Sequence, residues 1–417
     1  MVRAGAALRR RWMAAGVGLA AWVVAGSAES ADLFANVDAS TLVVRGAVEA
    51  VTPYEAAKLQ VFRIRVDRVL QGEAAAGETI ALAQEMLFAT TKPYFAPGAE
   101  SLVLAVPLPS YSRFREALPQ GTYWRWTQRL DTAADVAWLA DPAVADGVAA
   151  YVGVRDDAEA TADFLVATLV GSQPILRAHA LAALTARPAL RPLLDTGRLA
   201  PVAAWLRDHR QPLTVRGEVM EQLARAGAPG MADVAEGFLG DSGGLEPVAL
   251  DVLVTLRRLP PTDRLLGWSH SADDALRLAA CRGLLAAATP QALTRVVEVL
   301  RSDASSNVRL ELVKSLGTVE DVRIVEVLGD AMATAEKPLM LAAADALATI
   351  GSGAALAVLR QTLESGRPDA QAAAAFALKR SGKPEAQAIL ESLEQSHADP
   401  QVRRLCKLAL GESMHEH

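Results

Sequence analysis

The residues with the most evident potential for covalent chemistry are Asp241 and Ser242, in the stretch GDSGG at residues 240–244. A serine acts as a nucleophile when a histidine takes its proton and a third group orients that histidine. The histidines that precede it, His179 and His209, both fall in stretches with helical periodicity. Gly, Asp and Ser are also ordinary turn residues. We therefore interpret 240–244 as a turn between helices.

The same stretch is similar to the string around the nucleophile of chymotrypsin-like serine proteases, but the rest of that pattern is missing. No Ala-Ala-His-Cys segment lies upstream, and the sequence has no second barrel of the kind that family needs. No Gly-rich phosphate loop follows a strand pattern. The sequence therefore predicts a protein that is not an enzyme and that carries no cofactor.

Histidines are few and scattered. The tail at 414–417 reads Met-His-Glu-His, and imidazole and carboxylate groups bind metal ions. We interpret this tail as a disordered, solvated end of the chain. The two cysteines, Cys281 and Cys406, fall on core positions of a helical repeat, which predicts buried free thiols. No metal site is predicted.

Several charged and aromatic side chains are candidates for contacts with a partner. The recurring arginines of the repeat are Arg177, Arg216, Arg277, Arg309 and Arg403. They would form a positive stripe for an acidic partner, or they would bind carbonyls or acids of the neighbouring repeat. Glu311 and Lys314 lie between apolar positions of one repeat helix. Trp124 and Trp126 would form an aromatic contact site or pack in a core.

The element that positions most of these residues is a helical pattern that occurs eight times between 174 and 411. Its apolar anchors are Leu176, Val215, Val248, Leu276, Val308, Leu339, Ala370 and Val402. Leucine follows eight residues later each time, at Leu184, Leu223, Leu256, Leu284, Leu316, Leu347, Leu378 and Leu410. Residues four and eight apart lie on one helix face. Proline shortly before an anchor favours a first helical turn there. A period of this kind predicts stacked helix pairs.

The copies NVRLELVKSLG (307–317), DALRLAACRGL (274–284) and PQVRRLCKLALG (400–411) resemble HEAT repeats, in the short form shared with phycobilisome lyases. The resemblance covers about residues 160–412. It implies a right-handed α-solenoid of about eight helix pairs that binds a partner on its concave face, and the lyase likeness leaves an enzyme or enzyme subunit as an alternative. Ala249, Met340 and Gln371 replace the arginine in three copies, so a continuous arginine ladder is not expected.

The region before the helices has the pattern of a small β domain. Period-two alternation and apolar runs predict strands at 41–51, 59–70, 79–83, 101–106 and 122–127. Five short strands separated by Gly and Pro favour an antiparallel barrel or sandwich. Their order resembles OB-like barrels of exported proteins. This resemblance implies a further alternative, in which the barrel carries a ligand- or protease-binding function.

The first residues have the layout of a secretory signal. A front with four arginines precedes an uncharged run at 12–25, which is short for a membrane span of about 20 residues. We expect a signal peptide at 1–28, a barrel at 32–130, a junction at 131–157, a solenoid at 158–413 and a tail at 414–417. An uncleaved N-terminal anchor is the alternative.

The charge of the chain limits its partners. Removing residues 1–28 takes away four arginines and no acid, so the formal charge changes from −6 to −10. An acidic protein without a basic tract is a poor nucleic-acid binder. We therefore expect a periplasmic or extracellular protein, with no membrane span after signal removal, that binds an exported or envelope-associated protein. The sequence leaves the oligomeric state open.

Overall fold

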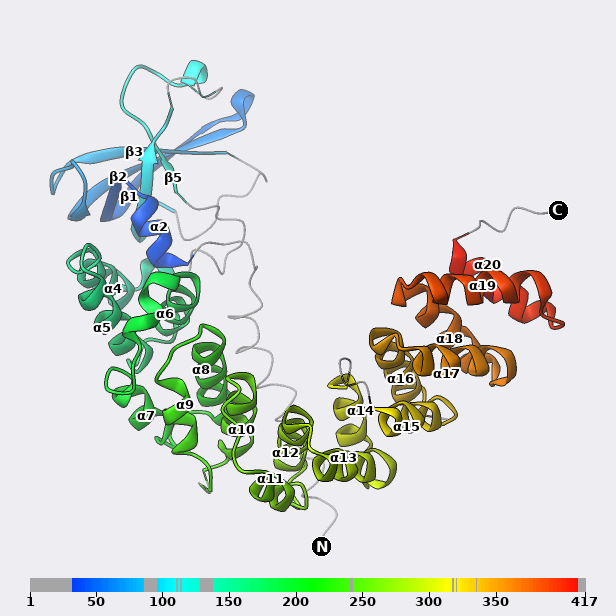
Figure 1. The fold of residues 1–417 in the computed structure, drawn as a ribbon. Helices are drawn as coiled ribbons and strands as arrows, with labels where there is room; N and C mark the ends of the chain where they lie inside the picture. Colours follow the sequence, from blue (N-terminus) through cyan, green and yellow to red (C-terminus); the bar gives the residue numbers. More distant parts are fainter. Residues whose placement is uncertain are drawn as a thin grey trace, which may run out of the picture. The chain divides into compact units, whose positions relative to one another are not determined.

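The structure is a computed structural model that describes residues 32–85, 96–109, 112, 115–127, 138–240, 243–316, 319, 321–334 and 336–411. It contains a small β-barrel and a long series of helices (Figure 1). The chain divides into two compact units, residues 1–234 and 235–417, which we describe separately. The predicted fold class, a β-barrel followed by about eight helix pairs, is confirmed.

The strands of the barrel are β1 (Leu42–Tyr54), β2 (Leu59–Gln71), β3 (Thr79–Glu85), β4 (Glu100–Pro107) and β5 (Trp124–Trp126). The helices are α2 (Leu33–Ala39), α4 (Pro142–Val152), α5 (Ala158–Leu169), α6 (Pro174–Ala186), α7 (Ala200–Leu206), α8 (Leu213–Arg225), α9 (Met231–Glu236), α10 (Glu246–Thr255), α11 (Thr262–Trp268), α12 (Asp274–Ala287), α13 (Pro290–Ser302), α14 (Ser306–Lys314), α15 (Val322–Met332), α16 (Lys337–Ile350), α17 (Gly353–Ser365), α18 (Pro368–Ser381), α19 (Pro384–Ser396) and α20 (Pro400–Leu410).

The five strands close into a barrel in the order β1-β2-β3-β5-β4. All neighbours pair antiparallel except β3 and β5, which pair parallel. The alternation seen in the sequence of β2 matches the observed burial, because Ile64 and Val66 face the core and Arg63 and Arg65 face solvent. Of the two predicted architectures, the barrel is therefore the one that forms.

The helix before the barrel, α2, packs against α4, α6 and β4 within the first unit. Phe34 of α2 contacts the rings of Tyr151 and Phe164, with centroids 4.6 and 5.7 Å away. The hydroxyl of Tyr151 donates a hydrogen bond to the Asp38 carboxylate and accepts one from Arg187. This cluster joins the start of the described chain to helices more than a hundred residues later.

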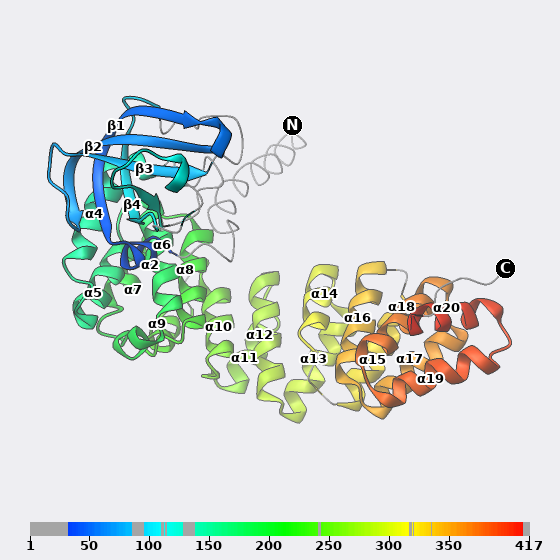
Figure 2. The same cartoon turned by 90° about the horizontal axis from the view of Figure 1, so that it is seen from above.

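In the second unit the helices form two layers. The second helix of each pair contacts the second helix of the next pair along the series α10, α12, α14, α16, α18 and α20. The first helices α11, α13, α15, α17 and α19 contact one another in the same way. Figure 2 shows α10, α12, α14 and α16 side by side. A single apolar core fills the space between the layers.

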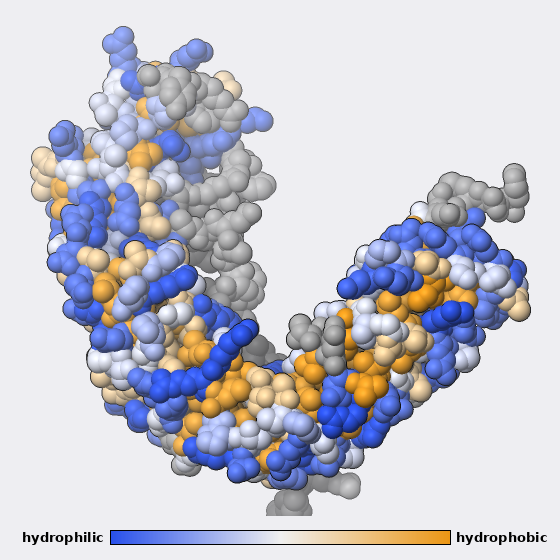
Figure 3. Space-filling view, in the orientation of Figure 1, coloured by the Kyte–Doolittle hydropathy of each residue, from blue (hydrophilic) through white to orange (hydrophobic). Residues whose placement is uncertain are grey.

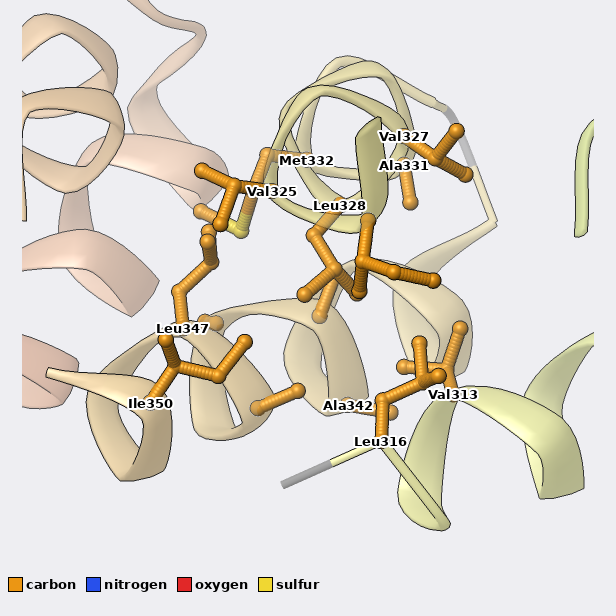
Figure 4. Close-up of a cluster of buried hydrophobic side chains, with 14 of the residues drawn as sticks. Val313, Leu316, Val325, Val327, Leu328, Ala331, Met332, Ala342, Leu347 and Ile350 are labelled. Atoms are coloured by element: carbon orange, nitrogen blue, oxygen red, sulfur yellow. The ribbon is translucent and has the colours of Figure 1, made fainter. Parts of the chain in front are cut away.

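Figure 4 shows part of this core, where side chains from α14, α15 and α16 point toward one another. Leu328 and Leu347 are fully buried there. The helix ends follow the predicted punctuation, with proline in the first turn of α16, α18 and α20. Gly382, which follows α18, has φ +63°, a left-handed conformation that favours glycine.

The repeated leucines lie where the pattern predicts, with one correction. Six of the eight are buried, and Leu256 and Leu410 are half-buried. In α10 the predicted anchor Val248 is half-buried, whereas Val252, four residues later, is buried as predicted, and so are the neighbouring Ala249 and Leu253. The reason is that α10 ends at Thr255, so Leu256 caps the helix and does not belong to its buried face. For that copy the predicted core position was right for Val252 and wrong for Val248 and Leu256.

Candidate partner-binding surface

The second helices of the second unit each have one face that is turned away from the apolar core. The anchors and the residues four and eight later face the core, so positions two and six after each anchor point away from it. We call these ten residues the second-helix surface: Leu278, Arg282, Leu310, Lys314, Leu341, Asp345, Ala372, Phe376, Arg404 and Leu408. None of the ten is buried.

Three large apolar side chains of this surface are exposed to solvent. Leu341 is 42% exposed, Phe376 47% and Leu408 43%, on the successive helices α16, α18 and α20. Among the described residues only Leu213 and Val322 are other large apolar side chains with comparable exposure. Single exposed apolar residues are common, but grouped ones mark interaction sites. Figure 3 shows apolar surface gathered over the α12 to α18 part of the chain.

Charge is distributed unequally between the two layers. The second helices α12 to α20 carry ten Lys or Arg and four Asp or Glu, a formal charge of +6. The first helices α11 to α19 carry five Lys or Arg and eight Asp or Glu, a formal charge of −3. The layer that exposes Leu341, Phe376 and Leu408 is therefore the basic one.

Each of the five recurring arginines binds carbonyl oxygens at the end of the helix that precedes its own. Arg277 donates to the carbonyl of Ser271 at 2.7 Å, and Arg403 to that of His397 at 2.6 Å. Four of the five reach the carbonyl six residues earlier: Arg177 to Gly171, Arg277 to Ser271, Arg309 to Asp303, and Arg403 to His397. The fifth, Arg216, is 4% exposed and reaches Leu206 at 2.8 Å. A cation at a helix C-terminus satisfies its last carbonyls and its negative dipole end.

Two of these arginines also bind acids of the next repeat. Arg277 forms a two-point ion pair with Asp303, at 2.6 and 3.0 Å. The hydrogen bond to Asp303 raises the pKa of Arg277, and their side chains are 12% and 6% exposed. Arg309 binds Glu336 at 2.7 Å. These contacts tie neighbouring repeats together, and the role of the five arginines in partner binding stays a prediction.

Arg367, which lies outside the repeat position, makes the helix-end contact that is missing in the copy without a recurring arginine. Met340 stands at the arginine position of α16 and is buried, 1% exposed. The carbonyl six residues before it, on Thr334, accepts a hydrogen bond from Arg367 in the following turn. The only signal in the sequence is the absence of arginine at 340, because the replacement comes from outside the repeat position.

The other predicted contact residues differ in accessibility. Lys314 and Glu311 form an ion pair with each other at 2.6 Å, and the Lys314 side chain is 53% exposed. Trp126 is 6% exposed and lies in the barrel core, so for this residue the alternative of core packing applies. Trp124 is half-buried. Asp241 and Ser242 lie outside the described residues, as does the tail at 414–417.

In the described part of the chain, most titratable groups that lie close together already form ion pairs. It contains no cluster of three or more His, Cys, Asp or Glu that could hold a metal ion. An open cavity of about 670 Å³ between the α11–α12 and α13–α14 turns is lined by Arg277, Arg295 and Asp303. Arg295 donates to the carbonyl of Ser269 at 2.9 Å, so all three charges already have partners. The arrangement is typical of a helix-capping network.

Comparison with known families identifies the helical region. Residues 262–348 and 325–411 match the family model of HEAT repeats, so the C-terminal region of the chain contains HEAT repeats. No curated protein matches the sequence significantly. The match is to HEAT repeats in general and not to the lyase form.

Two solved structures are similar to this chain at a distance. Human deoxyhypusine hydroxylase in complex with glycerol is 18% identical, with 61% of this chain and 96% of that chain covered and a TM-score of 0.28. An engineered protein is 19% identical, with 66% and 86% covered and a TM-score of 0.32. HEAT repeats are commonly protein-interaction modules, so their presence favours a protein-binding helical scaffold.

Proposed function

We propose that this protein is an exported, non-enzymatic scaffold that binds a protein partner through its second-helix surface. The observation that carries the proposal is the exposure of Leu341, Phe376 and Leu408 on three helices that contact one another in sequence. Covering such apolar side chains with a partner removes them from water and thereby stabilises the complex.

The rigidity of this surface follows from the core beneath it. Ala343, Leu347, Ala374 and Leu378 are fully buried or 1% exposed under the exposed face of α16 and α18. Because the helices do not need to order on binding, little conformational entropy is lost when a partner docks. The arginine contacts at the helix ends add to this rigidity by joining successive helices.

The apolar contacts alone are not sufficient for a stable complex. Covering the exposed half of a Leu or Phe side chain contributes roughly 1 kcal/mol. The three side chains therefore contribute about 3 kcal/mol, whereas a micromolar complex requires about 8 kcal/mol. The remainder must come from further contacts, for which the positive charge of the second helices is available.

Export is proposed from the layout of residues 1–28, which lie outside the described residues. The free state of Cys281 and Cys406 supports a fold that forms without disulfides in either redox environment. In the part of the chain that the structure describes, no helix has both the length and the apolar character required to cross a bilayer. Fractionation of cells that produce the full chain, with N-terminal sequencing of the mature protein, tests export.

A capture experiment with residues 29–417 tests the binding surface. The bait carries Phe376→Asp, and the matched control carries Val322→Asp, because Val322 is 64% exposed but lies on α15 in the first layer. We expect wild type and the control to retain the same envelope protein and Phe376→Asp to lose it. Equal retention by all three baits would contradict the proposed surface.

A fourth bait separates the scaffold from an enzyme. Ser242→Ala removes the one hydroxyl that stands in a nucleophile-like string. If the protein is a scaffold, the Ser242→Ala bait should capture the same partner in the same amount as wild type. A partner that accumulates in a chemically altered form only with the wild-type bait would favour the enzyme alternative.

A further inference from the structure

We propose that the partner presents an acidic segment with two or three apolar side chains, and that this segment lies across α16, α18 and α20. This inference depends on the proposed function, because it specifies what the second-helix surface binds. It starts from the coincidence of exposed apolar side chains and unneutralised positive charge on the same three helices.

The positive charge on these helices is partly unopposed. Lys337 of α16, Lys379 of α18 and Arg404 of α20 are exposed, and none forms an ion pair with another described residue. The acid on the same face, Asp345, is bound by Arg380 of α18 and is therefore neutralised. A partner that covers this face consequently meets a surplus of cations.

On each of the three helices a cation lies three or four residues from the exposed apolar side chain. Lys337 and Leu341 are four residues apart, as are Arg404 and Leu408, and Phe376 is three residues before Lys379. Residues three or four apart on a helix are neighbours on its surface. Each of the three helices therefore pairs one exposed apolar side chain with one adjacent cation.

The spacing of the helices gives the length of the segment. Packed helices lie about 8–10 Å apart, so the distance from α16 to α20 is roughly 20 Å. An extended segment crosses that distance in about six residues and a helical one in about thirteen. A peptide of 16 residues is long enough to test either conformation.

Mixed chemistry distinguishes this partner from a nucleic acid. A phosphate backbone would use the cations but would gain nothing from Leu341, Phe376 and Leu408. An acidic segment with apolar side chains is complementary to both features.

The experiment selects displayed random 16-residue peptides on immobilised residues 29–417. We expect the enriched peptides to be acidic and to contain two or more of Leu, Ile, Phe, Tyr and Trp. A fluorescein-labelled peptide with the consensus sequence should then bind at least tenfold more weakly to the Lys379→Glu, Arg404→Glu double variant. Its affinity should also fall as NaCl is raised.

The matched control reverses two exposed arginines of the first helices, Arg301→Glu and Arg360→Glu, whose side chains are 51% and 54% exposed. This control should bind the peptide as wild type does, and circular dichroism should show that both double variants are folded. Enrichment of neutral or basic peptides would overturn the inference, as would unchanged affinity for the Lys379→Glu, Arg404→Glu variant.

Two further outcomes are informative. Tighter binding of a labelled single-stranded oligonucleotide than of the peptide, unaffected by Phe376→Asp, would also overturn the inference in favour of a nucleic acid. If no peptide is enriched, the acidic-segment inference fails. In that case capture of a folded envelope protein that depends on Phe376 would leave the proposed function intact.

Discussion

The stability of the first unit should depend on pH through His179. This residue lies on α6, and its Nδ1 accepts a hydrogen bond from the backbone N–H of Leu33, the first residue of α2, at 3.2 Å. Burial lowers the pKa of His179 to about 4. The neutral imidazole therefore holds the helix at the start of the described chain against a helix 146 residues later.

The direction and size of the effect follow from proton linkage. An unfolded histidine binds a proton below pH of about 6.5, whereas the folded His179 does so only below about pH 4. Between these values the unfolded state binds more protons, so the free energy of unfolding decreases as the pH is lowered. A difference of about 2.5 pKa units corresponds to up to about 3 kcal/mol, all of it lost by pH 4. Protonation also removes the acceptor for Leu33.

The variant His179→Asn separates this effect from the titration of carboxylates. Asparagine keeps an acceptor near the position of Nδ1 but does not titrate. We expect urea unfolding to show that wild type loses stability relative to the variant as the pH is lowered. The difference between their free energies of unfolding should change by up to about 3 kcal/mol between pH 7 and pH 4. Amide hydrogen exchange of residues 33–40 should accelerate over the same range in wild type only. Parallel pH profiles for the two proteins would refute the reasoning.

Three further predictions concern single residues. Arg216→Ala should lower the free energy of unfolding by about 2 kcal/mol in urea titrations, because it leaves a buried helix-end carbonyl without its donor. Gly46→Ala should cost about 3 kcal/mol and lower the melting temperature, because its Cβ would lie 2.3 Å from the Arg65 carbonyl oxygen. Burial raises the pKa of Cys281 to about 12 and that of Cys406 to about 11. Neither thiol should therefore react with DTNB at pH 8 until the protein is unfolded in guanidinium.

Much of the fold was accessible from local patterns. Alternation over 59–70 predicted β2 because every second side chain of a half-buried strand faces the core. The recurring anchors and leucines predicted the second helices for the same reason, with a helical period. In the copy at α10, Leu256 was wrongly expected in the core, because nothing local revealed that α10 ends before it.

The candidate surface was less accessible. Glu311 and Lys314 were correctly placed on a second helix, yet they bind each other. Phe376 was missed, because it stands in an alanine-rich helix where an aromatic residue is usually part of the core. It is exposed because α18 packs between α16 and α20 with Phe376 on the side that faces solvent.

The amino-acid sequence by itself determined the number of helix pairs, the strands of the barrel and the recurring arginines of the second helices, since each is a property of residues near one another in the chain. Tertiary structure alone decided that β3 pairs parallel with β5, that Arg367 serves the carbonyl of Thr334, and that His179 holds Leu33. These three contacts join residues far apart in sequence, and their free energy exists only after packing has brought the partners within hydrogen-bonding distance.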